Sequence, residues 1–135
     1  MEKIIRKVGV AIIKDRKILL ARSKKNVEVF YLPGGKYEAN ETDIECMQRE
    51  LKEELDTTAK IETVKFLKEF NGVAHGKDSN TKLFTKLYIC ELVSNPKASS
   101  EIAEIRYFDS SIDAKHKSIL GEKIIIWLKQ NDYIN

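Results

Sequence analysis

The residues best suited to chemistry lie in one segment, LPGGKYEANETDIECMQRELKEEL, from Leu32 to Leu55. Three carboxylates, Glu50, Glu53 and Glu54, fall within five residues of a stretch with helical periodicity. At about 100° per residue they share an arc of roughly 100°, and Glu50 and Glu54 stand one turn apart. Like charges this close repel each other. The cluster therefore predicts a bound cation.

Hard divalent cations are the natural partners of such a cluster. Mg²⁺ takes carboxylate oxygens and shares its remaining positions with substrate phosphates, and a bound metal ion can polarise a phosphoryl oxygen or generate hydroxide from water. The preceding Pro33-Gly34-Gly35 loop allows close approach to the main chain. Arg49 and Lys52 are predicted to point away from the cluster. The alternative interpretation is a structural, charge-rich helix face in a protein-interaction domain, which needs no metal.

Alternating strands and two helices are predicted to position this segment. Apolar and β-branched runs predict six strands: Ile4–Lys14, Lys17–Arg22, Phe30–Leu32, Ile61–Asn71, Thr81–Val93 and Glu104–Phe108. The first two are expected to form a hairpin across Asp15-Arg16. Helices are predicted over Asn40–Asp56 and Gly121–Gln130. In the first helix Thr42 and Glu45 form a capping box, and the buried stripe is Ile44, Met47, Leu51 and Leu55.

Length and composition favour one globular domain. The chain has 135 residues, 42% hydrophobic and 33% charged, which suits a single α/β (α+β) domain with a mixed β-sheet flanked by helices. No apolar run is long enough to span a bilayer, and no signal peptide is evident, so we expect a cytoplasmic protein without a membrane partner. Cys46 and Cys90 are expected to be free, buried thiols.

Charge is distributed unevenly along the chain. Residues 1–25 hold nine lysines and arginines against two acids, whereas residues 38–56 hold eight acids against Arg49 and Lys52. A basic segment beside an acidic one suits a site that binds a metal ion and a phosphate together, although two solvated faces of opposite sign would give the same pattern. No basic run with interleaved aromatics occurs, so no nucleic acid polymer is expected as a partner.

The spacing of these residues resembles the signature of the Nudix hydrolases, G-x5-E-x7-R-E-U-x-E-E-x-G-U, where U is a bulky aliphatic residue. Seven of the nine defined positions agree: Gly35, Glu41, Arg49, Glu50, Leu51, Glu53 and Glu54. The last two differ, because Asp56 replaces the glycine and Thr57 the aliphatic residue. Aspartate is one of the few residues that tolerate φ > 0. We therefore expect a slightly less stable loop after the helix, with the site intact.

The resemblance implies a Nudix-like α/β/α sandwich and a single Nudix hydrolase domain over residues 1–135. It implies an enzyme acting on phosphorus-containing acid anhydrides, which cleaves a nucleoside diphosphate linked to another moiety by water attack on phosphorus. Mg²⁺, or Mn²⁺, is the implied cofactor. The small MutT-like outline suggests a nucleoside triphosphate substrate, and family habit suggests a homodimer. The competing interpretation is a nucleotide-binding regulatory domain with weak or no turnover.

Helix geometry and the resemblance together assign roles in the site. Glu50 and Glu54 are the expected primary metal ligands, because they stand one turn apart. Glu53 is the third ligand or the group that deprotonates or orients the water. Glu41 pairs with Arg49, or joins the metal shell through water near the substrate. Arg49 is expected to be structural and to hold the glutamates in place.

Further candidates flank this cluster. The main chain of Gly34 and Gly35 is expected to contact substrate, and the Gly35 carbonyl to join the metal ligands. Arg22, at a strand end, is expected to bind phosphate, with a plain surface arginine as the alternative. Other residues have a weaker functional interpretation beside an ordinary surface or core one: Glu101 and Glu104 as additional acids, His75 as a substrate contact, and Phe30, Tyr31 and Phe84 as base-stacking rings.

Overall fold

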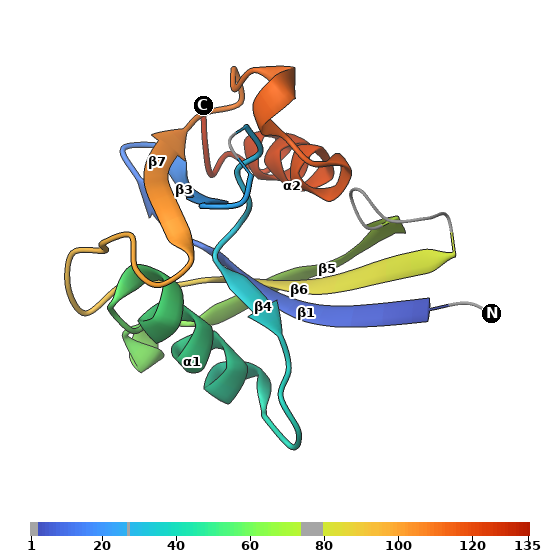
Figure 1. The fold of residues 1–135 in the computed structure, drawn as a ribbon. Helices are drawn as coiled ribbons and strands as arrows, with labels where there is room; N and C mark the ends of the chain where they lie inside the picture. The colour runs from blue at the N-terminus through green and yellow to red at the C-terminus, as the bar shows by residue number, and fades with distance from the viewer. Residues whose placement is uncertain (1–2, 27, 74–79) are drawn as a thin grey trace.

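The computed structural model describes residues 3–26, 28–73 and 80–135. Within them the strands form two sheets (Figure 1). The larger has the order β4-β1-β6-β5, with β4 at Gly34–Lys36, β1 at Lys3–Ala11, β6 at Thr81–Ile89 and β5 at Lys65–Val73. The smaller has the order β2-β3-β7, with β2 at Ile13–Lys14, β3 at Lys17–Ser23 and β7 at Ile102–Phe108. The helices are α1 (Asp43–Leu55) and α2 (Ile119–Gln130), with 3₁₀ turns at Ile61–Thr63 and Ala114–His116.

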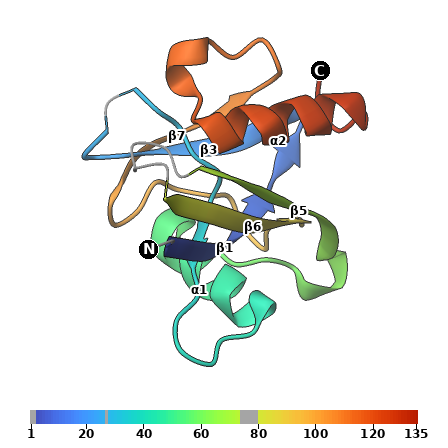
Figure 2. The same cartoon turned by 90° about the vertical axis from the view of Figure 1, so that its right-hand side faces the viewer.

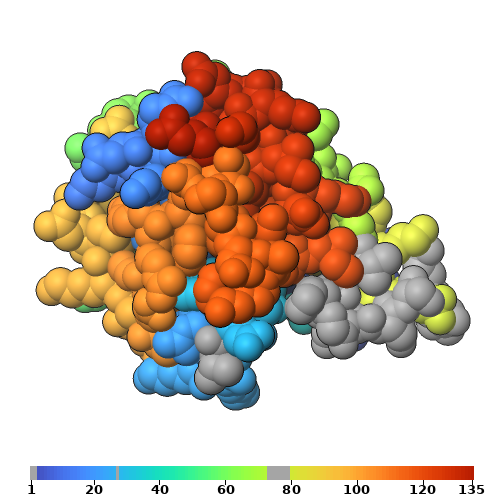
Figure 3. Space-filling model, turned by 90° about the horizontal axis from the view of Figure 1, so that it is seen from above, coloured from blue at the N-terminus to red at the C-terminus, as the bar shows by residue number. Residues whose placement is uncertain are grey.

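The helices lie on opposite sides of the sheets, as Figure 2 shows. One buried cluster joins α1 to the strands through Met47, Leu51 and Val8, and a second joins α2 to them through Leu120, Ile124 and other apolar residues. Strand β1 pairs parallel with β6 and antiparallel with β4. The predicted mixed α+β fold with flanking helices is therefore confirmed. Figure 3 shows that α2 and the segment before it, orange to red, cover most of the upper face.

The predicted hairpin across Asp15-Arg16 is confirmed, and it joins β2 to β3. Both turn residues have positive φ, 53° and 60°, as a two-residue hairpin turn of the primed type requires. Arginine is an unusual residue for that conformation. Its side chain donates hydrogen bonds to Asn135 Oδ1 at 2.6 Å and Asp132 Oδ1 at 2.6 Å, so the turn is held to the C-terminal segment.

The predicted strand Phe30–Leu32 is wrong. In this stretch Tyr31 forms an isolated bridge with Ala21, and the paired strand lies further on at Gly34–Lys36, where Gly35 faces Val8 of β1. Apolar content favoured the earlier residues, but Phe30 is instead buried in the core. A Cβ on Gly34 would come within 2.0 Å of the Val8 carbonyl oxygen. The edge of β1 therefore accepts a glycine segment rather than an apolar one.

Several predicted boundaries also move. The strand predicted from Ile61 begins at Lys65 because residues 61–63 form a 3₁₀ turn, in which the Thr63 hydroxyl donates to the Lys60 carbonyl. The strand predicted to reach Val93 ends at Ile89, since Val93 N–H donates to the Thr58 carbonyl outside the ladder. The last strand and the last helix each begin two residues earlier than predicted, at Ile102 and Ile119.

Helix α1 begins at Asp43, three residues after the predicted start, and its predicted capping box is confirmed. The Thr42 hydroxyl accepts from Glu45 N–H, and the Glu45 carboxylate accepts from Thr42 N–H. Met47, Leu51 and Leu55 are buried as predicted and Ile44 partly so. Both cysteines are free and buried, as predicted. Among the described residues, no helix has the length and apolar character needed to cross a membrane.

The two departures from the Nudix signature are accommodated at the end of α1. Asp56 caps the helix with φ 54° and ψ 37°, the left-handed conformation expected there, and its carboxylate accepts from Lys52 Nζ at 3.1 Å. The buried Thr57 hydroxyl forms a hydrogen bond with Ser94 Oγ at 2.7 Å. The Thr57 hydroxyl, at a position where the signature has an aliphatic residue, is therefore satisfied by a hydrogen bond. The helix still ends in the left-handed conformation that the signature glycine would adopt.

Substitutions at Asp56 should report the cost of this conformation. Glycine adopts φ > 0 freely, whereas alanine has no side-chain oxygen to support it. We expect Asp56→Gly to be more stable than Asp56→Ala by about 1 kcal/mol, measured by urea unfolding. The matched control, Lys52→Ala, removes the exposed ion pair alone and should change stability by less than about 1 kcal/mol. An alanine variant as stable as the glycine variant would contradict this account.

Candidate active site

The three clustered glutamates of α1 line one cavity of about 340 Å³. Glu50, Glu53 and Glu54 face it from the helix, and Lys7 of β1 and Glu101, just before β7, face it from elsewhere in the fold. The rest of the lining includes Tyr31, Leu32, Gly34, Ala21 and Ser23. Helical spacing accounts for the grouping of the three acids, while the opposite wall comes from distant parts of the chain.

Glu50 lies directly over the backbone of Gly35. A Cβ on Gly35 would come within 2.5 Å of Glu50 Oε2, so the absence of a side chain there makes room for the carboxylate. Arg49 Nη1 donates to Glu50 Oε1 at 2.9 Å. Burial of the carboxyl raises the pKa of Glu50, and the charge of Glu53 adds to that effect, although Arg49 and Lys7 oppose it.

Glu54 is held by the neighbouring glycine. Gly34 N–H donates to Glu54 Oε1 at 2.9 Å, which fixes the carboxyl group at the junction of α1 and β4. Burial, with the charges of Glu50 and Glu53, raises the pKa of Glu54 to about 7, while the Gly34 bond and Lys7 act in the opposite direction. Two carboxyl groups of the cluster therefore resist ionisation where they stand.

Arg49 points into the acidic cluster, and the expectation that it points away is wrong. Its long side chain turns back along the helix surface, donating to both Glu41 oxygens at 2.6 and 2.9 Å and to the Lys36 carbonyl at 3.0 Å. It also lies 3.6 Å from Glu53 Oε1. These bonds lower the pKa of Glu41 to about 2. Glu41 does not line the cavity; it secures Arg49 instead.

Arg22 is not brought into the cavity. Its neighbours Ala21 and Ser23 line the cavity, so strand alternation directs Arg22 to the other face of β3. There it donates to Glu104 Oε1 at 3.2 Å. Of the two additional acids considered from the sequence, Glu101 therefore lies at the cavity and Glu104 does not.

Lys7 was missed by sequence reasoning. It lies in the cavity, close enough for its charge to lower the pKa of both Glu50 and Glu54. The sequence feature that could have indicated Lys7 is its position immediately before the apolar run that begins at Val8. In a strand, alternation fixes which face of the sheet the side chain beside a buried residue lies on.

The aromatic candidates separate into different environments. Tyr31 lines the cavity and is 38% exposed, whereas Phe30 is buried and part of the core. Phe84 carries the Arg6 guanidinium over its ring at 5.1 Å. His75 lies outside the described residues. Only Tyr31 of these three rings therefore stands where it can meet a ligand of the acidic cavity.

The side chains of this cavity fit a hard divalent cation by their chemistry. Their donors are carboxylate oxygens, which Mg²⁺ and Mn²⁺ prefer, and a cation would offset the repulsion that helps raise the pKa of Glu50 and Glu54. As placed, no three acidic, histidine or cysteine side chains in the described ranges stand close enough together to hold an ion. Glu50 is turned to Arg49 and Glu53 is about half exposed, so coordination requires these two side chains to rotate.

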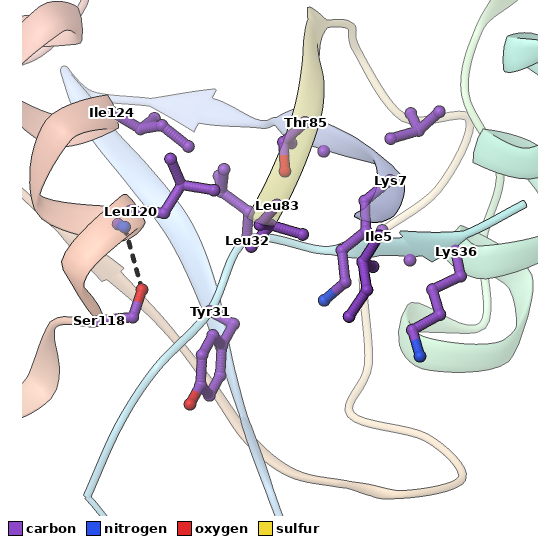
Figure 4. A pocket seen from close by; sticks show the side chains of 15 residues that line it. Ile5, Lys7, Tyr31, Leu32, Lys36, Leu83, Thr85, Ser118, Leu120 and Ile124 are labelled. Carbon is purple, nitrogen blue, oxygen red and sulfur yellow. Dashed lines mark hydrogen bonds between the residues drawn. The ribbon is translucent and has the colours of Figure 1, made fainter. Parts of the chain in front are cut away.

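A second cavity of about 270 Å³ adjoins the first (Figure 4). The two share Lys7, Tyr31, Leu32 and Gly34 in their linings. Its walls come from β1, β6 and the start of α2, and they are mainly apolar. This arrangement was not predicted, because its residues are scattered from the N-terminal strand to the last helix.

Comparisons with known proteins agree on one family. The model of the NUDIX domain matches residues 3–118. Solved structures of similar fold include the Escherichia coli ORF135 protein, with 20% identity, TM-score 0.74 and coverage of 96% of this chain and 94% of that one. A MutT NUDIX hydrolase from Burkholderia pseudomallei has 19% identity, TM-score 0.77 and coverage of 93% and 98%.

A UDP-X diphosphatase has 22% identity and TM-score 0.76, with coverage of 98% of this chain and 66% of that one. At such identities the likeness establishes the fold. A search among curated proteins gives no match in sequence. The family model covers most of the chain, and the signature residues lie on β4, on α1 and, for Glu41, in the connection between them. This chain therefore belongs to the Nudix hydrolase family, whose enzymes cleave phosphoric anhydride bonds.

Proposed function

We propose that the protein is a Mg²⁺-dependent pyrophosphohydrolase that cleaves a nucleoside diphosphate linked to another moiety, with nucleoside triphosphates as the first class to test. The observation that carries the proposal is the shared cavity of Glu50, Glu53, Glu54 and Lys7. It offers acid oxygens for a cation and an ammonium group for a phosphate within one space. Solved structures of similar fold are described as a UDP-X diphosphatase and an ADP-ribose pyrophosphatase, which supports this substrate class.

In this proposal Glu50 and Glu54 hold Mg²⁺, or Mn²⁺, with the Gly35 carbonyl as a further donor. A bound divalent ion supplies positive charge to the phosphoryl oxygens and acidifies a water molecule. Glu53 is a third ligand or accepts the proton of the attacking water. Its half-exposed carboxylate lies 3.6 Å from Arg49, whereas Glu54 is fixed by the Gly34 N–H.

Cationic and structural residues complete the site. Lys7 takes the phosphate-binding role that the sequence suggested for Arg22, because Lys7 lines the cavity and Arg22 faces Glu104. Arg49, anchored by Glu41, positions Glu50 and Glu53 until a cation competes for them. We further propose that the enzyme acts in the cytoplasm, where its two free buried thiols stay reduced.

A panel of nucleoside triphosphates, sugar nucleotides, ADP-ribose and dinucleoside polyphosphates tests the function. Each is incubated with Mg²⁺ or with EDTA, and products are separated by ion-pair chromatography. We expect a nucleoside monophosphate as product, in Mg²⁺ only. Tight binding without turnover of any compound would instead favour a regulatory nucleotide-binding domain.

Replacing Glu53 tests its role at the reacting water. Glu53→Gln should lower kcat roughly 10²–10⁴-fold, since an amide neither accepts the proton nor carries ligand charge. Its thermal unfolding should match wild type because the side chain is about half exposed. Turnover close to the wild-type rate would remove Glu53 from the mechanism.

The raised pKa of Glu54 predicts a pH-dependent stability. Because the folded pKa of about 7 exceeds the unfolded value of 4.5, the folded state binds more protons between these pH values. Without metal, stability should fall as pH rises from about 4.5 to 7, by up to about 3 kcal/mol from this group. Glu54→Gln removes that loss, so in EDTA at pH 8 it should melt several degrees above wild type, and at pH 4 the two should coincide.

Glu53→Gln is the matched control, since it removes the same charge from a more exposed place on the helix. It should raise the melting temperature in EDTA at pH 8 by much less than Glu54→Gln does, because the Glu53 charge contributes less than burial to the raised pKa of Glu54. Added Mg²⁺ should stabilise wild type more than Glu54→Gln, measured by differential scanning fluorimetry. A wild-type melting temperature that does not fall between pH 4 and 8 in EDTA would contradict the account.

Gly35 provides a test that leaves every carboxylate in place. Gly35→Ala puts a Cβ within 2.5 Å of Glu50 Oε2, so the Glu50 carboxylate must move. We expect Mg²⁺ affinity to fall roughly 10–100-fold, as for other changes that misorient a ligand, with metal binding followed by calorimetry. The control is Gly72→Ala, whose nearest neighbour is the end of the Lys123 side chain at 3.4 Å. Unchanged affinity in Gly35→Ala would disprove the positioning role.

A further inference from the structure

One face of α1 meets β4 and the residue after it in a regular order (Figure 1). The polar members of this face follow one another at intervals of three or four residues, the spacing of neighbours on a helix surface: Asp43, Cys46, Glu50 and Glu54. Near the end of the helix, Glu54 accepts from Gly34 N–H at 2.9 Å and Glu50 lies against Gly35. These two contacts place the glutamates that we propose as primary metal ligands.

The same order continues toward the start of the helix. Cys46 Sγ lies 3.5 Å from the Lys36 carbonyl oxygen, and Asp43 Oδ1 accepts from the Tyr37 hydroxyl at 2.7 Å. Successive residues of the helix face therefore contact successive residues of the chain, from 37 back to 34. Because all these contacts belong to one rigid helix, a tilt or slide of α1 that breaks the contact at Asp43 also moves Glu50.

Asp43 connects the helix to the larger sheet as well. Its Oδ2 accepts from the Tyr88 hydroxyl, and Lys86 Nζ lies 3.5 Å from the same oxygen. Both residues belong to β6. Burial acts to raise the pKa of Asp43, but the hydrogen bonds from Tyr88 and Tyr37 outweigh it and the pKa is lowered. The Asp43 carboxylate is therefore ionised at neutral pH and accepts a hydrogen bond from each phenol.

Three segments thus converge on one carboxylate at the first turn of α1: the helix, the connection after β4, and β6. Among the described residues that line the acidic cavity, none belongs to this group. Its action differs from that of Arg49, which donates directly to the Glu50 carboxylate. Arg49 restrains the side chain of a metal ligand, whereas the bonds of Asp43 restrain the helix that carries the ligands.

We infer that Asp43 is a positioning residue, whose bonds to Tyr37 and Tyr88 set the position of α1 against β4 and thereby the placement of Glu50 and Glu54. The inference rests on the proposed function for the metal ion that these glutamates bind. Asp43 acts from a distance, since it precedes Glu50 by seven residues, about two helical turns. Helical spacing did not indicate this role, because Tyr88 lies 45 residues beyond Asp43 in the chain.

The amide proton of Gly34 reports the placement of Glu54 without metal or substrate. Asp43→Ala removes the bonds to both phenols, so the bond from Gly34 N–H to Glu54 should open more often. We expect this proton to exchange with solvent about 10-fold faster in EDTA, measured by NMR, a factor equivalent to roughly one net hydrogen bond. Asp43→Asn should restore most of the protection, because its amide accepts from one phenol and donates to the other.

Tyr37→Phe gives the same test in a variant that keeps its ring and is expected to fold as wild type does. It removes only the bond between Asp43 and the connection after β4, so Gly34 exchange should rise about threefold. The control is Thr63→Ala, which removes two hydrogen bonds in a 3₁₀ turn, to the Lys60 carbonyl and from Glu91 N–H. It should lower the melting temperature and leave the exchange of Gly34 N–H unchanged.

Metal binding and turnover give a second readout. Asp43→Ala should weaken Mg²⁺ binding about 10-fold in calorimetry, as other changes that misplace a metal ligand do. At saturating Mg²⁺ its kcat should fall while KM changes by less than about threefold, because the groups that bind substrate elsewhere are untouched. Asp43→Asn should recover both Mg²⁺ affinity and kcat, and Thr63→Ala should keep the wild-type values.

Gly34 exchange that is unchanged in both Asp43→Ala and Tyr37→Phe would overturn the inference. A lowered melting temperature of Asp43→Ala with wild-type Mg²⁺ affinity would also overturn it, because Asp43 would then only stabilise the fold. If wild type hydrolyses no compound of the substrate panel, the proposed function fails. Faster Gly34 exchange and weaker Mg²⁺ binding in Asp43→Ala would still support the positioning role in that case.

Discussion

Two adjacent glycines are confined between a strand and a helix, and the site depends on this close contact. A Cβ on Gly34 would come within 2.0 Å of the Val8 carbonyl oxygen. A Cβ on Gly35 would come within 2.5 Å of Glu50 Oε2. Strand β4 can therefore pair with β1 while α1 rests on it. A side chain at Gly34 would collide with the Val8 main chain, and a side chain at Gly35 would displace the Glu50 carboxylate.

The contact of α1 with β4 holds Glu50, Glu53 and Glu54 at one cavity, and nearby basic side chains neutralise only part of their negative charge. Arg49 pairs with Glu41 and Glu50 from the helix itself, and Lys7 adds a positive charge from β1. Even so, burial and repulsion raise the pKa of Glu54 to about 7. Such unfavourable placement of ionisable groups is typical of functional sites. The same groups would be stabilised by a divalent cation, which links the electrostatics of the fold to the proposed chemistry.

The site consists of two adjoining cavities with different linings. One is lined by carboxylates and the other mainly by apolar side chains, and Lys7, Tyr31, Leu32 and Gly34 belong to both. Helix α1 supplies the charged part and helix α2, on the far side of the sheets, supplies part of the apolar wall. The α/β/α layering thus places the two linings side by side.

The sequence by itself determined the features that depend on neighbours in the chain. The capping box of α1, the hairpin turn at Asp15-Arg16, the left-handed conformation of Asp56 and the grouping of three glutamates follow from spacing and residue type. The signature residues also identified the family.

Only the tertiary structure decided which distant residues meet the acids. It placed Lys7 rather than Arg22 in the cavity, turned Arg49 inward, and paired Gly34–Lys36 rather than Phe30–Leu32 with a sheet. A shift of one residue in strand pairing reverses which side chains face a site. Local periodicity does not fix that register, because it results from packing between strands far apart in the chain.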